Sequence, residues 1–254
     1  MKQIIIGVVA VAVILGGAVL FGKKDNNVTG SPSSHVYGNA QSSVTLVEYG
    51  DLECPACGGF FPLVKQLKEE YKDKIRFEYR NFPLVQVHQH ALAAHRAVEA
   101  ANKQGKFWEM HDLLYERQED WNGPSASDPT GIPMSQALSL FESYAKELGL
   151  NVDQFKTDEQ SNDVLGTINA DIARGTSDGV NSTPTFFLNG KKIEDTNSID
   201  TLDKFKKLID DALGTKSSGN TGTDTQQQTT TPEAAPTTVS PIPAPSTENT
   251  NSGQ

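Results

Sequence analysis

The sequence predicts an α/β fold in which a strand–helix–strand unit is followed by a helical block and then by two short strands and a last helix. Three observations predict it. Two runs rich in β-branched and aromatic residues, 44–49 and 75–80, flank an amphipathic helical stretch. Helical spacing dominates from about 84 to 176. After residue 180 the pattern returns to strand, with a turn signal at Asn189-Gly190.

The first unit is predicted to be parallel. The run 44–49 is apolar on both faces, as expected of a buried central strand. From Gly58 to Asp73 apolar residues recur at helical spacing, with lysines and glutamates on the opposite face. The run 75–80 alternates between apolar and polar residues. A strand, helix and strand in this order imply a right-handed crossover between parallel strands.

The middle block is predicted to be helical and the last part to complete the sheet. Residues 90–118 carry a seam of alanines, 119–133 resemble an exposed loop, and 134–148 and 152–174 give two or three further helices. Strands are expected at 185–188 and 191–193. Ser198 or Asp200 is expected to cap the last helix, which Gly214 ends. This order is a thioredoxin-like layout with an inserted all-helical subdomain, about 84–176.

The two ends of the chain differ from this domain, which we place at 41–214. Residues 4–22 are apolar and uncharged, and as a helix they would be nearly long enough to span a bilayer. Residues 1–24 are therefore expected to be an uncleaved signal anchor, and a removed signal peptide is the alternative. Residues 25–40 form a polar linker. The Ser/Thr/Pro/Gln-rich tail, 215–254, is expected to be disordered. A net charge of −10 gives no basic face for nucleic acid.

The two cysteines of the chain, Cys54 and Cys57, lie where the first strand gives way to the helix. A helix N-terminus stabilises a thiolate, which is the form of cysteine that attacks a disulfide. Cys54 is therefore expected to be exposed at this terminus, with Cys57 one turn inside and placed to resolve a mixed disulfide. Pro55 suits the first turn of a helix. Redox chemistry is the interpretation that this spacing favours.

Two other interpretations of the pair remain open on the residues alone. A zinc site needs four ligands, and His88 and His90 could complete it, although a second CxxC is missing from the sequence. A structural disulfide that closes so short a loop would stabilise little. Thr183-Pro184, ahead of an apolar strand, could be a cis peptide bond or a trans proline that starts an edge strand.

Three segments together resemble a known family: the run 44–57, which ends in Cys54-Pro55-Ala56-Cys57, and residues 105–112 and 183–187. They are similar, in this order, to the active-site segment, the helical insert and the cis-proline loop of the DsbA-like thiol–disulfide oxidoreductases. The membrane-anchored, extracytoplasmic members of that family are the ones this sequence resembles most. These matches, in order, cover roughly residues 38–213.

The resemblance implies roles for individual residues. Cys54 would be the nucleophile and Cys57 the resolving thiol of a redox-active disulfide that needs no cofactor and no metal. Pro184 would be cis, and the backbone of Thr183 would pair with an extended substrate. Glu48 would be a buried acid that moves a proton to or from Cys57; its alternative is a solvated carboxylate.

Two further positions can be compared with that family, and one of them departs from it. His88 matches a family histidine, for which we expect a packing role. Ala56 stands where the strongest oxidants carry a histidine, so the thiolate should be less stable and the couple less oxidising.

The resulting expectation is a single-pass membrane protein whose domain faces the extracytoplasmic side and introduces disulfides into exported cysteine-containing proteins. The resemblance implies a membrane quinone-linked partner of the DsbB or vitamin K epoxide reductase type. The alternatives are a reductase or isomerase of the same fold, or a non-catalytic binding module.

Overall fold

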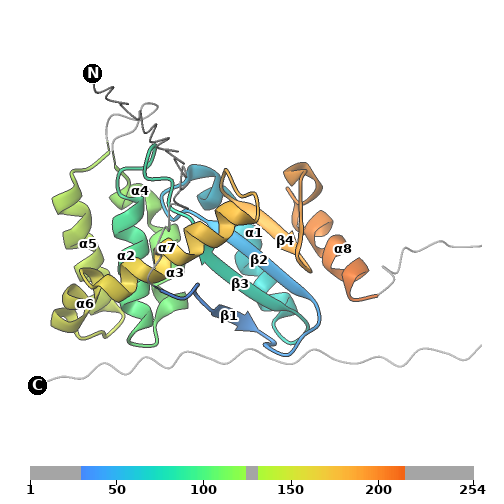
Figure 1. Cartoon of the computed structure of the whole chain (residues 1–254), viewed down its shortest axis with the longest axis horizontal. Coiled ribbons are helices and arrows are strands. Elements are labelled where there is room, and N and C mark those ends of the chain that lie inside the picture. The colour runs from blue at the N-terminus through green and yellow to red at the C-terminus, as the bar shows by residue number, and fades with distance from the viewer. Residues whose placement is uncertain (1–29, 124–130, 215–254) are drawn as a thin grey trace, which may run out of the picture. The chain divides into compact units, whose positions relative to one another are not determined.

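The computed structural model describes residues 30–123 and 131–214, which contain a five-stranded sheet (Figure 1). The strand order is β1-β3-β2-β4-β5, with β2 parallel to β3 and the other neighbours antiparallel. The strands are β1 His35–Gly38, β2 Thr45–Gly50, β3 Arg76–Asn81, β4 Thr185–Leu188 and β5 Lys191–Lys192. This is the predicted thioredoxin-like sheet.

The helices also follow the predicted order. Helix α1, Pro55–Tyr71, connects β2 to β3, and α8, Leu202–Ala212, follows β5 and the short 3₁₀ turn Thr196–Ser198. Between β3 and β4 lie the helices of the insert: α2 Ala91–Asn102, α3 Phe107–Glu116, α4 Gln118–Trp121, α5 Met134–Glu147, α6 Val152–Glu159 and α7 Asn162–Ser177. Figure 1 shows most of the insert gathered at one end of the sheet.

The two faces of the sheet are covered by different helices. Helix α8 packs on β4, where the rings of Phe186 and Phe205 lie 5.4 Å apart, and α1 packs beside it. Helix α7 covers the opposite face at Gly175, where an added Cβ would lie 2.8 Å from the ring of Tyr49. The two layers bury the middle of the sheet, as a thioredoxin-like layout requires.

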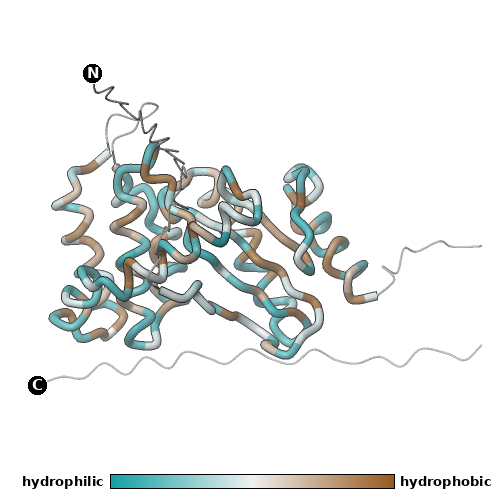
Figure 2. The backbone as a smooth tube through the Cα atoms, in the orientation of Figure 1, coloured by the Kyte–Doolittle hydropathy of each residue, from teal (hydrophilic) through white to brown (hydrophobic). Residues whose placement is uncertain are grey.

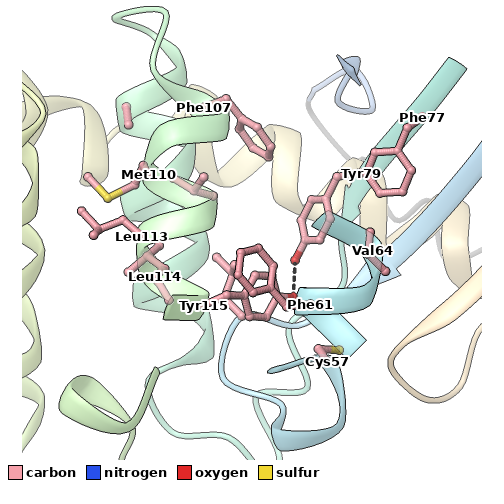
Figure 3. Close-up of a cluster of buried hydrophobic side chains, with 14 of the residues drawn as sticks. Cys57, Phe61, Val64, Phe77, Tyr79, Phe107, Met110, Leu113, Leu114 and Tyr115 are labelled. Atoms are coloured by element: carbon pink, nitrogen blue, oxygen red, sulfur yellow. Dashed lines mark hydrogen bonds between the residues drawn. The ribbon is translucent and has the colours of Figure 1, made fainter. Parts of the chain in front are cut away.

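The insert shares one core with the sheet. Phe61 of α1 stacks on Tyr115 of α3 with ring centroids 5.1 Å apart, and the Tyr79 and Tyr115 hydroxyls are hydrogen-bonded at 3.3 Å (Figure 3). Cys57 lies at the edge of this cluster. The reactive segment is thus supported by residues of both the sheet and the insert.

Three local expectations were wrong. The predicted linker 25–40 contains β1, which pairs with β3. The predicted loop 119–133 starts inside α4, whose Trp121 is fully buried and donates its ring N–H to the carbonyl of Leu114. Thr201, rather than Ser198 or Asp200, caps α8 by accepting from the backbone N–H of Lys204. In each case long-range packing or a neighbouring hydroxyl outweighs the local pattern.

The signal anchor expected at 1–24 and the tail expected at 215–254 lie outside the described residues. Across 30–123 and 131–214, the structure has no helix that is long and apolar enough to span a bilayer. Hydrophobic residues recur along the helices in alternation with hydrophilic ones (Figure 2). That alternation is typical of helices with one buried face.

Candidate active site

The turn between β2 and α1 fixes the backbone of Cys54. Cys54 is the N-cap of α1, with φ −67° and ψ 122°, and Pro55 follows in the first turn, where a missing N–H costs little. The N–H of Cys54 donates to the carbonyl of Asp51 at 3.1 Å, and the carbonyl of Cys54 accepts from the N–H of Gly58 at 3.0 Å. The Cys54 thiol is therefore held at the positive end of α1.

This environment favours the Cys54 thiolate. The pKa of Cys54 is lowered to about 6, chiefly by a hydrogen bond from the Cys57 thiol, with the backbone N–H groups of Cys57 and Ala56 adding to it, while burial acts in the opposite direction. Cys54 is 6% exposed, so the expectation of an exposed thiol was wrong. Its reactivity comes from the groups around it and not from open contact with solvent.

Cys57 has the opposite properties. It is 1% exposed, and burial, the neighbouring Cys54 and the charge of Glu48 raise its pKa well above the ordinary value. Both cysteines are free thiols in this structure. The site thus pairs a thiolate with a protonated thiol one helical turn away, the arrangement needed for attack at one sulfur and resolution by the other.

The loop before β4 completes the site. The Thr183–Pro184 peptide bond is cis, as the resemblance implies. The backbone carbonyl of Thr183 accepts a hydrogen bond from the Cys54 thiol at 3.5 Å. Two motifs far apart in the sequence are therefore in direct contact.

Glu48 is a buried acid. It is 3% exposed and lies on β2 in register with Tyr79 of β3 and Phe186 of β4. Burial raises its pKa to about 8, against the opposing charge of Lys68. The structure excludes the alternative of a solvated strand-end carboxylate. A carboxyl group with this pKa can exchange a proton near neutral pH.

His88 is bound to the active-site turn. Its Nδ1–H donates to the Asp51 carboxylate at 2.7 Å, and the same carboxylate accepts from the N–H of Glu53 at 2.9 Å and of Leu84 at 2.8 Å. His90 donates its Nδ1–H to the carbonyl of Trp121. Among the described residues, no group of three or more His, Cys, Asp or Glu side chains could hold a metal ion.

Two residues that the sequence analysis missed attach the insert to the turn. The Glu53 carboxylate accepts from the N–H of His90 at 2.6 Å and of Gly123 at 2.7 Å. The Gln118 amide donates to the carbonyls of Leu52 and Cys54. The position of Glu53 beside Cys54 was a signal for the first. No local pattern indicates Gln118, because its partners lie more than 60 residues earlier in the chain.

Comparison with known proteins agrees with this geometry. The thioredoxin family matches residues 30–211. BdbD from Bacillus subtilis is 23% identical with a TM-score of 0.58, over 73% of this chain and 97% of that one. DsbA2 from Pseudomonas aeruginosa is 25% identical with a TM-score of 0.51, over 70% and 95%.

Curated sequence relatives are longer proteins. The Na⁺/H⁺ antiporter NhaA 3 of Salinispora tropica is 36% identical over 168 residues, which is 66% of this chain and 23% of the relative. The chain thus spans less than a quarter of that protein's length.

The fold, the differentiated thiols and the adjoining cis-proline loop define a thiol–disulfide oxidoreductase. The chain belongs to the thioredoxin family and is DsbA-like within it. Exchange of this kind needs no cofactor, because the cysteine pair itself holds the two electrons.

Proposed function

We propose that this chain is a membrane-tethered, extracytoplasmic oxidase that introduces disulfides into exported proteins. The observation that carries the proposal is the difference between the two thiols. A thiolate at Cys54 stabilises the reduced enzyme, so the disulfide form is the better oxidant. At neutral pH, a Cys54 pKa of about 6 keeps this thiol mostly ionised.

The reaction follows from that difference. A substrate thiolate attacks the Cys54 sulfur of the Cys54–Cys57 disulfide, a mixed disulfide forms, and Cys57 leaves and takes up a proton. Glu48 is the proposed proton donor, since its pKa of about 8 keeps it protonated at neutral pH. A second substrate thiolate then attacks the substrate sulfur of the mixed disulfide and Cys54 leaves as a thiolate. The substrate loses two electrons and the enzyme gains them.

The Thr183 backbone is the proposed docking edge for an extended substrate. Its carbonyl already contacts the Cys54 thiol, so a chain paired there would bring its own sulfur to Cys54. The substrates in this proposal are exported proteins with cysteine pairs.

The location and the reoxidising partner are part of the same proposal. The apolar run 4–22 would anchor the chain with the domain outside, and a membrane quinone-linked protein of the DsbB or vitamin K epoxide reductase type would reoxidise the pair. Impermeant thiol reagents should label reduced Cys54 on intact cells. Labelling after lysis alone would overturn the extracytoplasmic placement.

A reductase is the second candidate function. The Cys54 pKa of about 6 lies nearer to the value of about 7 known for thioredoxin than to the value of about 3.5 of the strongest oxidant of this kind. The reduction potential decides between them. Equilibration with glutathione buffers should give a potential above about −200 mV for an oxidase, whereas about −270 mV would indicate a reductase. Activity unchanged by Cys54→Ser would instead indicate a binding module.

A further inference from the structure

Gln118, the first residue of α4, connects the helical insert to the backbone on both sides of Glu53. Its Nε2 donates to the carbonyl of Leu52 at 2.7 Å and to the carbonyl of Cys54 at 3.1 Å. Both partners are carbonyl oxygens, so the atom that faces them is the amide nitrogen. One half-buried side chain thereby holds two carbonyl groups of the segment that carries Cys54.

Space for this amide is provided by Gly58. A Cβ at Gly58 would lie 2.4 Å from the Gln118 Oε1, too close for the side chain to stay where it is. The next residue, Gly59, has nothing within 4 Å of an added Cβ. A glycine inside a helix costs about 1 kcal/mol of stability relative to alanine. At position 58 a glycine leaves room for the Gln118 amide, which an alanine would displace.

The reactivity of Cys54 depends on the backbone that Gln118 holds. The thiolate is stabilised by the N–H groups of Ala56 and Cys57, which requires Cys54 to keep its N-cap geometry. The carbonyl of Cys54 is shared between the N–H of Gly58 and the Gln118 amide. The amide also directs the positive end of its dipole at this turn, as the helix does.

We propose that Gln118 is a positioning residue through which the helical insert sets the thiolate stability of Cys54, and that Gly58 preserves the space it needs. This inference rests on the proposed function, in which Cys54 is the nucleophile. Gln118 does not touch the sulfur, and its effect passes through the two carbonyls.

The first test is Gln118→Ala in the full chain, with Gln104→Ala as a matched control. Gln104 is also a half-buried amide of the insert with two backbone hydrogen bonds, in its case to Asn151, far along the chain from the cysteines. Gln118→Ala should raise the Cys54 pKa by roughly one unit. From about 6, that shift makes the equilibrium constant against glutathione about fivefold less oxidising at pH 7, or about 20 mV. Gln104→Ala should leave both unchanged.

The second test moves Gln118 without replacing it. Gly58→Ala should raise the Cys54 pKa as Gln118→Ala does, whereas Gly59→Ala should not. Because Gly58→Ala acts through the Gln118 side chain, adding it to Gln118→Ala should produce no further shift. This pair also keeps the inference testable if Gln118→Ala folds poorly.

The outcomes distinguish a failure of the inference about Gln118 from a failure of the proposed function. If the native chain exchanges disulfides and Gln118→Ala or Gly58→Ala leaves its pKa and its glutathione equilibrium unchanged, the inference about Gln118 is wrong and the proposed function stands. Additive shifts in the double variant would equally refute the route through Gln118. If Cys54 in the native chain titrates near 8.5 and performs no exchange, the proposed function fails and the inference fails with it.

Discussion

Burial raises the pKa of the Cys57 thiol on α1, and a negative charge on the buried Glu48 of β2 would raise it further. Burial keeps both groups protonated at neutral pH, because each would otherwise be a charge in a region of low polarity. In the proposed exchange, in which Cys57 leaves as a thiolate, protonated Glu48 would be the acid that neutralises it. The acid and the resolving thiol would then act as one proton-transfer unit.

The first prediction concerns the stability cost of Glu48. Its pKa is raised from 4.5 to about 8 in the folded chain, so the folded state holds a proton that the unfolded state has lost between these values. Stability should therefore fall as the pH rises from about 4.5 to about 8. Glu48→Gln should remove that fall and stabilise the reduced chain at pH 7 by on the order of 2–3 kcal/mol. Urea unfolding across this pH range measures it, and parallel profiles for the two chains would contradict it.

The second prediction tests whether a hydrogen-bond donor at position 57 lowers the pKa of Cys54. The largest cause of the low Cys54 pKa is the hydrogen bond from the Cys57 thiol. Cys57→Ser keeps a donor there, and Cys57→Ala removes it. Each variant leaves Cys54 as the single thiol of the sequence, so its rate of alkylation against pH reports its pKa directly. The midpoint should stay near 6 in Cys57→Ser and rise by roughly one unit in Cys57→Ala. Equal midpoints would show that the side chain at position 57 does not contribute to the low pKa of Cys54.

The third prediction concerns Ala56, which is exposed between the cysteines. A histidine there would place a positive charge beside the Cys54 thiolate and lower its pKa. A decrease of about one unit from about 6 would make the couple roughly tenfold more oxidising at pH 7, or about 30 mV. Ala56→His should show this change in glutathione buffers, and Ala56→Gln, which adds bulk without charge, should not. A shift of equal size in Ala56→Gln would attribute the effect to shape.

Much of the fold could be predicted because its elements carry their own periodicity. The strands β2 and β3 and helix α1 follow from local patterns of apolar residues. Strand β1 does not, because it is held by distant partners. His35 stacks on Phe107 with ring centroids 3.5 Å apart and contacts Glu99 at 2.7 Å. A strand of only four residues is stabilised here by tertiary contacts that a local sequence pattern does not contain.

The candidate site also contains residues that sequence motifs predict and residues that they do not. The cysteines and the cis-proline loop carry recognisable motifs, and Glu48 followed from the resemblance. The groups that tune them come from elsewhere in the fold. Gln118 reaches the turn from the insert, and Lys68 acts on Glu48 from the far part of α1. In the sequence, Lys68 looks like a residue of the solvated helix face, and the structure shows it to be 3% exposed.

The fourth prediction tests that action of Lys68. Its ammonium group lies 4.2 Å from the centroid of the Trp108 ring and 3.4 Å from the Asp112 carboxylate. Its positive charge lowers the pKa of Glu48, although burial prevails and the value remains about 8. Lys68→Met keeps an apolar chain of similar length and removes the charge, so the Glu48 pKa should rise by roughly half a unit. Carboxyl NMR titration measures the midpoint, with the Glu48 signal assigned by its loss in Glu48→Gln.

Lys65→Met is the matched control for this experiment. Lys65 lies on the same helix and pairs with the same Asp112 carboxylate at 3.3 Å, but it is much more exposed and has no resolved effect on Glu48. Its removal should leave the Glu48 midpoint near 8. A rise in Lys68→Met alone would establish that a buried lysine on α1 lowers the pKa of Glu48. An unchanged Glu48 midpoint in Lys68→Met, or equal shifts in both variants, would refute the prediction. The charge of Lys68 would then have no specific effect on the pKa of Glu48.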